Sequence, residues 1–440
     1  MLWSPIDEND RHTATEDPTL DPPTGHANTV TAAYYHRSAT LPLESLQPLV
    51  HDALSRVMLQ LPAMGAIFDH AVQFIQLRDG RDEEVDALVE EQQNMRFPEP
   101  YEKVPCWRLI IAYTSGRRSV SDMVACFVVS EPARDQMCGM DFHRSFSAAL
   151  LLVNKAKLSK QPSEYPSANS SERLSNSWQG KQTSHTQRHS RFKAVTLGAT
   201  DTARLLVACV TSKTNLTCVM QAVLAASLFA NIHSEFSTLR TAGQISPTHI
   251  MGNPSATPCS RYITTHNRAQ GWHMTSIWNE GRRIHTASKA ELGGKTRSNS
   301  RLGFLRREGG YTLCDTKDIG KTSGVSVAVS SMESFQNSKS QQCEKQQEWQ
   351  TGRMMSSNDS NEISAALSVT LVVGGDGCLT LGFSWLEGDF EDVWLDQVIV
   401  NMRRLIGELL HTNGATQTET LPWGGSVSRL IYMVRNLMLE

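Results

Sequence analysis

Several short patterns in the chain contain residue types that could do chemistry, but each is incomplete. Gly320-Lys321-Thr322 matches the end of a phosphate-binding loop, yet Asp315 stands where such a loop has its first glycine. Gly294-Lys295-Thr296 fails in the same way, because Lys289 takes that position. No G-x-S-x-G sequence occurs, so an α/β-hydrolase would lack its nucleophile. The nine cysteines form no C-x-x-C pair, which predicts no metal site and indicates the reduced thiols of a cytoplasmic protein.

The bulk composition describes a globular protein that does not bind nucleic acid. The 440 residues are enough for one large domain or two ordinary ones, and 40% of them are hydrophobic. The net charge is −3, and the Lys and Arg residues are dispersed instead of clustered as phosphate binding requires. The longest apolar stretch, Cys218–Ile232, is interrupted by Gln221 and is too short to span a bilayer. No signal peptide and no integral membrane span are therefore expected.

The spacing of apolar residues predicts a mixture of helices and strands. Strands are expected at 29–35, 72–77, 108–113, 124–129 and 325–329, and helices at 43–60, 82–94, 141–156, 201–210 and 215–232. Asp201 is predicted to cap the helix at 201–210, and Thr214 or Asn215 is predicted to cap the helix at 215–232.

The end of the chain has the clearest local signals. Two alternating segments around Gly374–Gly377 predict a β-hairpin over 367–385. A helix is predicted at 393–410, with Val393 on its buried stripe, and a last helix at 427–439.

Polar stretches divide the chain into two halves. The segment 160–191 is predicted to be a linker and 339–360 a polar loop, whereas 251–300 is turn-rich without a clear pattern. The expected layout is a disordered tail at 1–25, an N-terminal half at 26–159, a crossover at 160–192 and a C-terminal half at 193–440. The fold class that follows is α/β or α+β.

One segment carries a specific resemblance. The letters from Ser130 to Leu150, S-E-P-A-R-D-Q-M-C-G-M-D-F-H-R-S-F-S-A-A-L, resemble the active-site stretch of fungal alcohol acetyltransferase-like proteins. That family lies within the superfamily of chloramphenicol acetyltransferase and peptide-synthetase condensation domains. Its stretch reads approximately H-H-A-I-x-D-G-x-S-G-x-x-F-H-R-S-F-x-A-A-L. The positions that keep the family residue are Asp135, Gly139, Phe142, His143, Arg144, Ser145, Phe146, Ala148, Ala149 and Leu150.

Further short segments follow the family pattern in order between residues 28 and 412. They are Pro105 to Leu109, Trp178 to Gly180, Asn215 to Thr217, Leu302 to Leu305, Val329 to Glu333 and Trp385 to Gly388. The resemblance implies two chloramphenicol-acetyltransferase-like halves with a channel between them. It also implies that acyl-CoA enters from one face and an alcohol from the other. In the family the second histidine is the general base, and the aspartate holds the loop.

The sequence departs from the family at the catalytic positions. Ser130 and Glu131 replace the two histidines, and Gln136 replaces the glycine after Asp135. None of the 14 histidines begins an H-x-x-x-D sequence that could substitute. An ordinary glutamate has a pKa near ~4.3 and is a poor base for a hydroxyl unless burial raises its pKa. The resemblance thus assigns Glu131 to the base position and Asp135 to the loop-holding position, while His143 is interpreted as a packing or surface residue of the next helix.

The segment that resembles the V-S-N-L-G turn of the family is also altered. Ser330 and Ser331 stand where the family has the Ser-Asn of V-S-N-L-G, and Glu333 replaces its glycine. With Ser130 and Gln136, these two serines are the predicted substrate contacts.

Three functions remain open. The first is an acetyl-CoA-dependent (or other acyl-CoA-dependent) O-acyltransferase, a monomer that acetylates a hydroxyl of a small fungal secondary metabolite. The second is a catalytically inactive or repurposed acyltransferase scaffold that binds a metabolite or a partner protein. The third is a different reaction in the same channel, such as a Glu131-assisted cyclisation or elimination.

Overall fold

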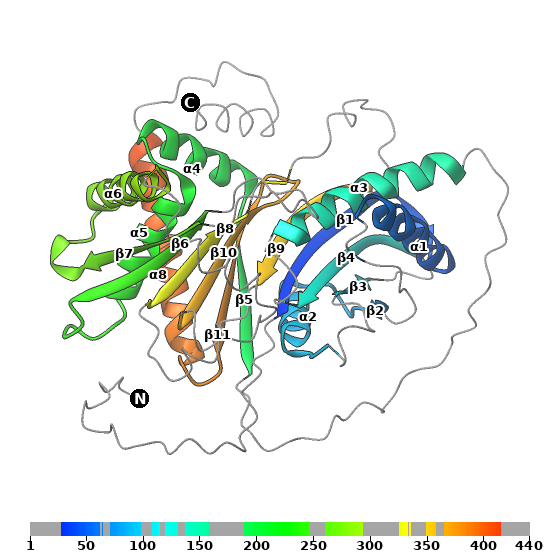
Figure 1. The fold of residues 1–440 in the computed structure, drawn as a ribbon, viewed down its shortest axis with the longest axis horizontal. Helices are drawn as coiled ribbons and strands as arrows, with labels where there is room; N and C mark the ends of the chain where they lie inside the picture. The colour runs from blue at the N-terminus through cyan, green and yellow to red at the C-terminus, as the bar shows by residue number, and fades with distance from the viewer. Residues whose placement is uncertain are drawn as a thin grey trace, which may run out of the picture.

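The chain forms two β-sheets that lie side by side, each with its own helices (Figure 1). The computed structural model describes residues 28–61, 64, 71–97, 107–114, 119–130, 137–157, 189–245, 260–293, 325–332, 334–335, 349–357 and 365–414. The tail predicted at 1–25 and the helix predicted at 427–439 lie outside these ranges. The mixed α/β class predicted from the sequence is confirmed.

The first sheet has five strands in the spatial order β2-β3-β4-β1-β9. These are β2 (Val72–Gln76), β3 (Trp107–Tyr113), β4 (Ser119–Ser130), β1 (Asn28–Pro42) and β9 (Trp349–Ser357). Helices α1 (Leu43–Gln60) and α3 (Met137–Lys157) pack on one face, and α2 (Asp82–Asn94) packs on the other. Because helices cover both faces of this sheet, the side chains on both faces of its central strands are buried. This is why β3 and β4 have near-continuous apolar runs.

β9 joins this sheet from far along the chain. It pairs antiparallel with β1, so that Val30 faces Ser357 and Ala33 faces Met354. The prediction of a polar loop across 339–360 was wrong for this strand. Its sequence, WQTGRMMSS, is weakly apolar, and its burial comes from β1 on one side and from the hairpin of the second sheet on the other.

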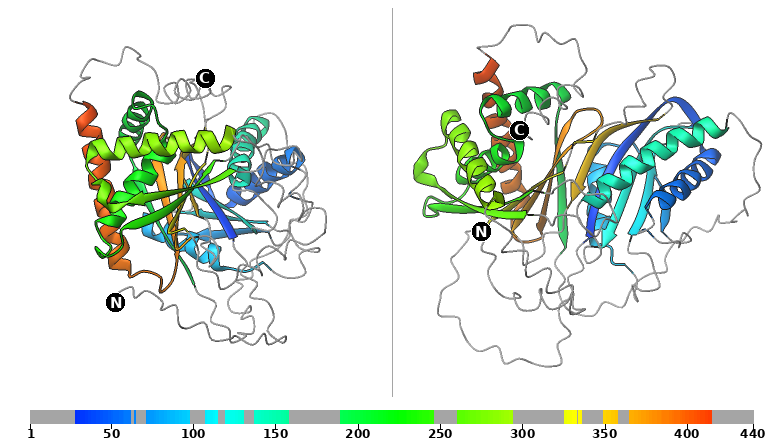
Figure 2. Two further views of the ribbon diagram at one scale, coloured as in Figure 1. Left: turned by 60° about the vertical axis from the view of Figure 1, so that its left-hand side comes forward. Right: turned by 45° about the horizontal axis from the view of Figure 1, so that its top comes forward.

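The second sheet has six strands in the order β5-β11-β10-β8-β6-β7. These are β5 (Ser190–Leu197), β11 (Leu379–Leu386), β10 (Leu367–Val373), β8 (Val327–Ser331), β6 (Thr238–Ile245) and β7 (Ser260–Asn267). The helices α4 (Ala199–Thr211), α5 (Leu216–Phe229), α6 (Met274–Gly293) and α8 (Asp392–Gly414) cover one face (Figure 2), and a 3-10 turn, η3 (Arg268–Gln270), precedes α6. The predicted hairpin is thus confirmed as β10 and β11.

The two faces of the second sheet differ in chemistry. Val369, Leu381 and Phe383 belong to the apolar core under the helices. The alternate residues point the other way and are mostly small and polar, and the buried polar ones include Ser330, Ser368, Thr370, Thr380 and Ser384. This second face, which we call the polar face, is directed toward the first sheet, because Gly382 on it contacts Ser356 of β9.

Two helix predictions need correction. Helix α4 begins at Ala199 with Gly198 as its N-cap, so Asp201 lies in the first turn and is not the cap. Val393 lies in the first turn of α8 and is 70% exposed, whereas Val398 on the same helix is buried. The Asn215 cap of α5 is confirmed, because its side chain accepts a hydrogen bond from the Cys218 N–H at 2.9 Å.

Candidate active site

The structure fixes both ends of the loop that carries the family motif. Ser130 is the last residue of β4, where it pairs with Asn28 of β1. Helix α3 begins at Met137. Glu131, Asp135 and Gln136 lie between these ends, outside the described residues. Their roles therefore stay predictions.

His143 is an internal residue of α3 and does not face solvent. Its side chain is fully buried, with Nε2 3.0 Å from the Thr31 carbonyl oxygen and Nδ1 3.0 Å from the Tyr35 hydroxyl. Burial lowers the pKa of His143 to about 4, although the bond to Thr31 opposes that shift. The ring is therefore neutral near pH 7 and already engaged at both nitrogens, which excludes it as the free base of the reaction.

Thr31 is the point at which α3 meets the first sheet. A Cβ on Gly139 would overlap the Thr31 hydroxyl, so this position in the first turn of α3 requires glycine. The same hydroxyl lies 3.5 Å from Ser356 Oγ of β9, which in turn donates to the Val30 carbonyl at 3.1 Å. Gly139, Thr31 and Ser356 thus connect the start of α3 to β9.

The contact continues into the polar face of the second sheet. A Cβ on Gly382 of β11 would overlap the Ser356 carbonyl oxygen. Gly382 pairs with Thr370 of β10, whose Oγ1 lies 3.4 Å from Ser330 Oγ of β8. Ser330 and the start of α3 are therefore joined by an unbroken line of small residues across both sheets.

Gly382→Ala is expected to destabilise the chain by about 2 kcal/mol, because an added methyl must push the two sheets apart at backbone atoms. Gly407→Ala in α8 is the matched control, since a Cβ there meets nothing within 4 Å. That control should gain up to about 1 kcal/mol from helix propensity. Urea unfolding measures both, and equal effects of the two substitutions would contradict the close approach of the sheets.

Ser331 has a different environment from Ser330. Its hydroxyl donates to the Met332 carbonyl at 3.4 Å, at the end of β8. The next residues cross to the first half, because Met332 and Phe335 pack in the core formed by α1, α3 and the first sheet. The turn after β8 thus bridges the halves, which sequence spacing alone did not reveal.

A ladder of side chains on α2 holds the edge of the second sheet. Asp86 accepts from the Ala194 N–H at 3.0 Å, Glu90 from the Phe192 N–H at 2.9 Å and Asn94 from the Ser190 N–H at 2.8 Å. Four helical residues rise about 6 Å, and two strand residues rise about 6.6 Å, so the two elements stay in register. The ladder closes the outer edge of β5 and fastens the halves to each other.

Because of Asp86, the contribution of this ladder to the stability of the fold depends on pH. Burial raises its pKa from 3.8 to about 7, and nearby Asp82 adds to the rise, while the Ala194 N–H, Arg353 and Lys193 oppose it. The folded chain consequently binds more protons than the unfolded chain between these values, and its free energy of unfolding falls as the pH rises through that window.

Asp86→Asn is therefore expected to stabilise the chain at about pH 8, by on the order of 2 kcal/mol, and to have little effect near pH 4. The amide oxygen keeps the bond to Ala194 without a buried charge. Thermal unfolding of both proteins across this pH range measures the difference. A stability difference that does not change with pH would contradict the proposed titration of Asp86.

The described residues of the P-C-W-R-L segment, which begin at Trp107, hold neighbouring elements together through hydrogen bonds to backbone carbonyls. Trp107 donates its indole N–H to the Met64 carbonyl at 2.6 Å. Arg108 donates to the carbonyls of Gln92 and Met95 at 2.5 and 2.8 Å, and the Asn28 amide also donates to Met95 at 2.7 Å. These donors satisfy the free carbonyls at the end of α2. The segment is thus a structural junction of α2, β3 and β1.

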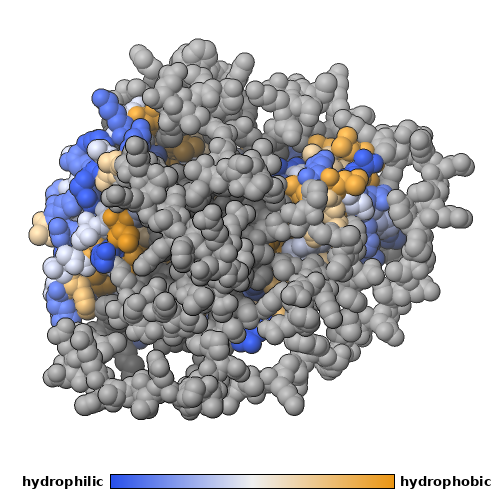
Figure 3. Space-filling model, viewed as in Figure 1, coloured by the Kyte–Doolittle hydropathy of each residue, from blue (hydrophilic) through white to orange (hydrophobic). Residues whose placement is uncertain are grey.

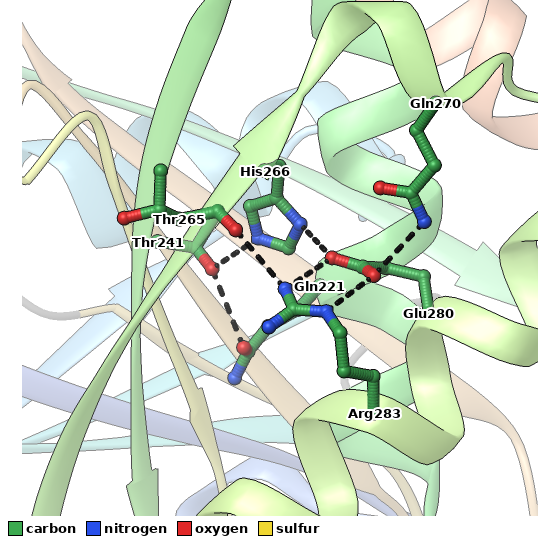
Figure 4. Close-up of polar contacts among 7 residues, drawn as sticks. All are labelled: Gln221, Thr241, Thr265, His266, Gln270, Glu280 and Arg283. Carbon is green, nitrogen blue, oxygen red and sulfur yellow. Dashed lines mark hydrogen bonds and ion pairs between the residues drawn. The ribbon is translucent and has the colours of Figure 1, made fainter.

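A second polar cluster lies under the helices of the second sheet (Figure 4). Glu280 of α6 and His266 of β7 are both fully buried, with Oε1 and Nδ1 2.6 Å apart. His266 Nε2 lies 2.8 Å from the Thr241 hydroxyl, and Arg283 donates to both Glu280 oxygens at 2.6 and 2.7 Å. Gln270 donates to Glu280 at 3.0 Å.

This cluster has the order hydroxyl, imidazole and carboxylate, but Thr241 is fully buried and turned toward α5. No substrate can reach it in this conformation, so the arrangement is structural. Burial would raise the pKa of Glu280, but hydrogen bonds from Arg283, His266 and Gln270 outweigh it and lower the pKa to about 2. Arg283 lies at the solvent side, where hydrophilic residues gather over α6 (Figure 3).

The sequence is similar to that of a known relative. It is 24% identical over 376 residues to the probable alcohol acetyltransferase crmB of Aspergillus fumigatus, covering 76% of this chain and 79% of the relative. No family model matches the chain.

Two solved structures share the fold. The trichothecene 15-O-acetyltransferase of Fusarium sporotrichioides superposes with a TM-score of 0.58 at 10% identity, covering 86% of this chain and 91% of that one. The first condensation domain of the CDA synthetase gives a TM-score of 0.55 at 12% identity, covering 88% and 90%. The predicted resemblance to alcohol acetyltransferase-like proteins and the predicted two-lobed fold are confirmed.

Two features are absent from the described part of the chain. Among the helices in the described ranges, none is long and apolar enough to cross a membrane. Within the same part of the chain, no three His, Cys, Asp or Glu side chains gather as a metal site would require.

Proposed function

We propose that the chain is an acetyl-CoA-dependent O-acetyltransferase that acts on a hydroxyl group of a small fungal metabolite. The observation that carries the proposal is the similarity to an alcohol acetyltransferase over 376 residues. The close packing of Gly139 and His143 against Thr31 supports it, because both positions keep the residue of the family pattern and the contact places the start of α3 against β1.

In the proposed reaction Glu131 is the general base. The acceptor hydroxyl gives its proton to the Glu131 carboxylate as its oxygen attacks the thioester carbonyl. The carbon–sulfur bond then breaks, the proton passes to the sulfur, and free CoA and the acetate ester leave. Asp135 holds the loop. Most of the rate enhancement then comes from holding two substrates in line.

The substrate contacts follow from the same proposal. Ser130 contacts the substrates from the end of β4, Gln136 from the motif loop, and Ser330 and Ser331 from the end of β8. The acyl-CoA and the alcohol meet in a channel between an N-terminal half (26–159) and a C-terminal half (193–440). We further propose that the protein works as a monomer in the cytoplasm.

A second function is favoured by one specific observation, the replacement of both motif histidines by Ser130 and Glu131. In this alternative the fold binds a metabolite or a partner protein without acyl transfer. The two functions differ in turnover. Incubation with acetyl-CoA and a panel of fungal alcohols, followed by mass spectrometry, should give acetate esters under the first proposal. Absence of every ester, with intact acetyl-CoA, would favour the second.

A further inference from the structure

We propose that the ladder between α2 and β5 is a pH-dependent latch between the two halves, closed while the Asp86 carboxyl group carries a proton and released when that proton leaves. Three side chains of α2 accept hydrogen bonds from three backbone N–H groups of β5: Asp86 from Ala194, Glu90 from Phe192 and Asn94 from Ser190. The latch is independent of the proposed acyl transfer, since it involves neither Glu131 nor either substrate.

β5 can separate from α2 without losing its place in the second sheet. It is the first strand in the order of that sheet, and its other edge pairs with β11 from Ser190 to Leu197. On the α2 side each of the three N–H groups is held by one side chain, and a side chain can change rotamer while the backbone stays in place. Release of the latch is therefore a local opening that leaves the core of the second sheet folded.

The Asp86 carboxyl group is only half satisfied in the closed latch. Its Oδ2 accepts from the Ala194 N–H at 3.0 Å. Its Oδ1 is buried and has no hydrogen-bond partner among the described residues. An ionised carboxylate is costly to bury when one oxygen has no donor, whereas the neutral acid carries a much smaller penalty. The geometry of the closed latch thus favours the protonated form of Asp86.

The two cations near Asp86 are each held by another carboxylate. The charged and titratable groups around Asp86 come from four elements: Asp82 and Glu90 of α2, Tyr34 of β1, Arg353 of β9 and Lys193 of β5. Arg353 donates to both Asp82 oxygens and to the Tyr34 hydroxyl. Lys193 Nζ lies 2.5 Å from Asp396 Oδ1 of α8. Neither cation therefore forms an ion pair of its own with Asp86 that would keep it ionised.

The direction of the pH effect follows from the pKa of Asp86. Burial raises this pKa from 3.8 to about 7, although the Ala194 N–H opposes the rise. In the open latch the carboxyl group meets water and regains its ordinary pKa. The closed latch consequently binds more protons between these two values, so the equilibrium constant for opening rises with pH across the window and levels off above it. From pH 5 to pH 8 this constant should rise on the order of 100-fold.

Amide hydrogen exchange of the full chain tests the latch, because the N–H groups of Phe192 and Ala194 are themselves its donors. Exchange is measured at pH 5 and pH 8, corrected for the intrinsic effect of pH on exchange, and repeated at low urea concentrations. Protection of both amides should fall on the order of 100-fold between the two pH values, through an opening that is insensitive to urea. Val369, in the centre of β10, should exchange only through global unfolding, which urea accelerates.

Two variants identify the titrating group. Asp86→Asn keeps an oxygen for the Ala194 N–H but has no proton to lose, so protection of Phe192 and Ala194 should differ by less than about threefold between pH 5 and pH 8. Glu90→Gln changes the next contact of the ladder in the same way and is the matched control. It should keep the large fall in the protection of Ala194.

Two results would overturn the proposal. If Phe192 and Ala194 exchange with the same free energy and the same urea dependence as Val369 at both pH values, β5 does not open separately from the rest of the sheet. If Asp86→Asn keeps the pH-dependent fall in protection, Asp86 is not the group that releases the latch.

Discussion

Glu131→Gln is expected to reduce acetyl transfer by at least about 100-fold, because the amide keeps the size of the side chain but cannot take the proton of the acceptor. Binding of acetyl-CoA should change little, since the base acts on the alcohol. The measurement is the rate of ester formation at saturating acetyl-CoA. Glu408→Gln is the control, because this carboxylate lies on the surface of α8, where it pairs with Arg404.

Glu131→His should raise the rate, because an imidazole with a pKa near 6.5 is better matched to a neutral solution than an ordinary carboxyl group. Full turnover by Glu131→Gln would show that the base lies elsewhere. An inactive wild type together with an active Glu131→His variant would instead identify a scaffold that has lost catalysis but kept its binding sites.

Glu280→Gln is expected to lower the free energy of unfolding by about 3 to 5 kcal/mol. The carboxylate is fully buried and accepts from His266, Arg283 and Gln270, so its loss leaves buried donors facing a neutral amide. Urea unfolding of the full chain measures the loss. The same Glu408→Gln variant is the matched control, since an exposed i,i+4 pair contributes at most about 0.5 kcal/mol.

The effect of Glu280→Gln should also depend on pH. The pKa of Glu280 is lowered to about 2 from an ordinary value of 4.5, so its ionised form stabilises the fold above the ordinary value. That contribution is lost as the pH falls toward the lowered value. The difference between wild type and variant should therefore shrink below about pH 4. A difference that stays constant down to that range would show that the cluster is not ionic.

Local sequence patterns were sufficient to predict the elements that are amphipathic or that are formed by residues close together in sequence. Helices α1 and α2 begin and end at the predicted residues, and the hairpin of β10 and β11 follows its Gly-rich turn. The apolar period of the two helices and the turn residues of the hairpin agree with the observed elements, so tertiary contacts did not need to override them.

Elements whose burial comes from distant partners escaped prediction. β9 has no apolar alternation of its own, and β1, the strand that it pairs with, lies near the other end of the sequence. β7 and α6 lie within the stretch 251–300, for which the sequence showed no clear pattern, and β7 pairs with β6 just before it. The buried Glu280 cluster stabilises these elements. The Glu280–Arg283 spacing was readable as an i,i+3 pair, but its burial and its His266 partner were not.

The sequence resemblance located the segments that form the candidate site, but it did not predict how their residues are arranged in space. The motif around Gly139 and His143 pointed to the right segment, and Ser330 lies at the end of the line of contacts that starts there. Thr31 and Ser356, which join the two, have no motif of their own. They are ordinary small residues that matter because two backbones approach closely at Gly139 and Gly382.

Titration of the wild-type chain with acetyl-CoA in a calorimeter tests the central claim most directly, because acyl transfer from CoA requires that this donor binds. We expect saturable binding of one acetyl-CoA per chain, with a dissociation constant on the order of 1 μM to 1 mM. Unacetylated CoA should compete for the same site. Absence of saturable heat at several millimolar acetyl-CoA, from a chain shown to be folded, would contradict the assignment as an acetyl-CoA-dependent acyltransferase.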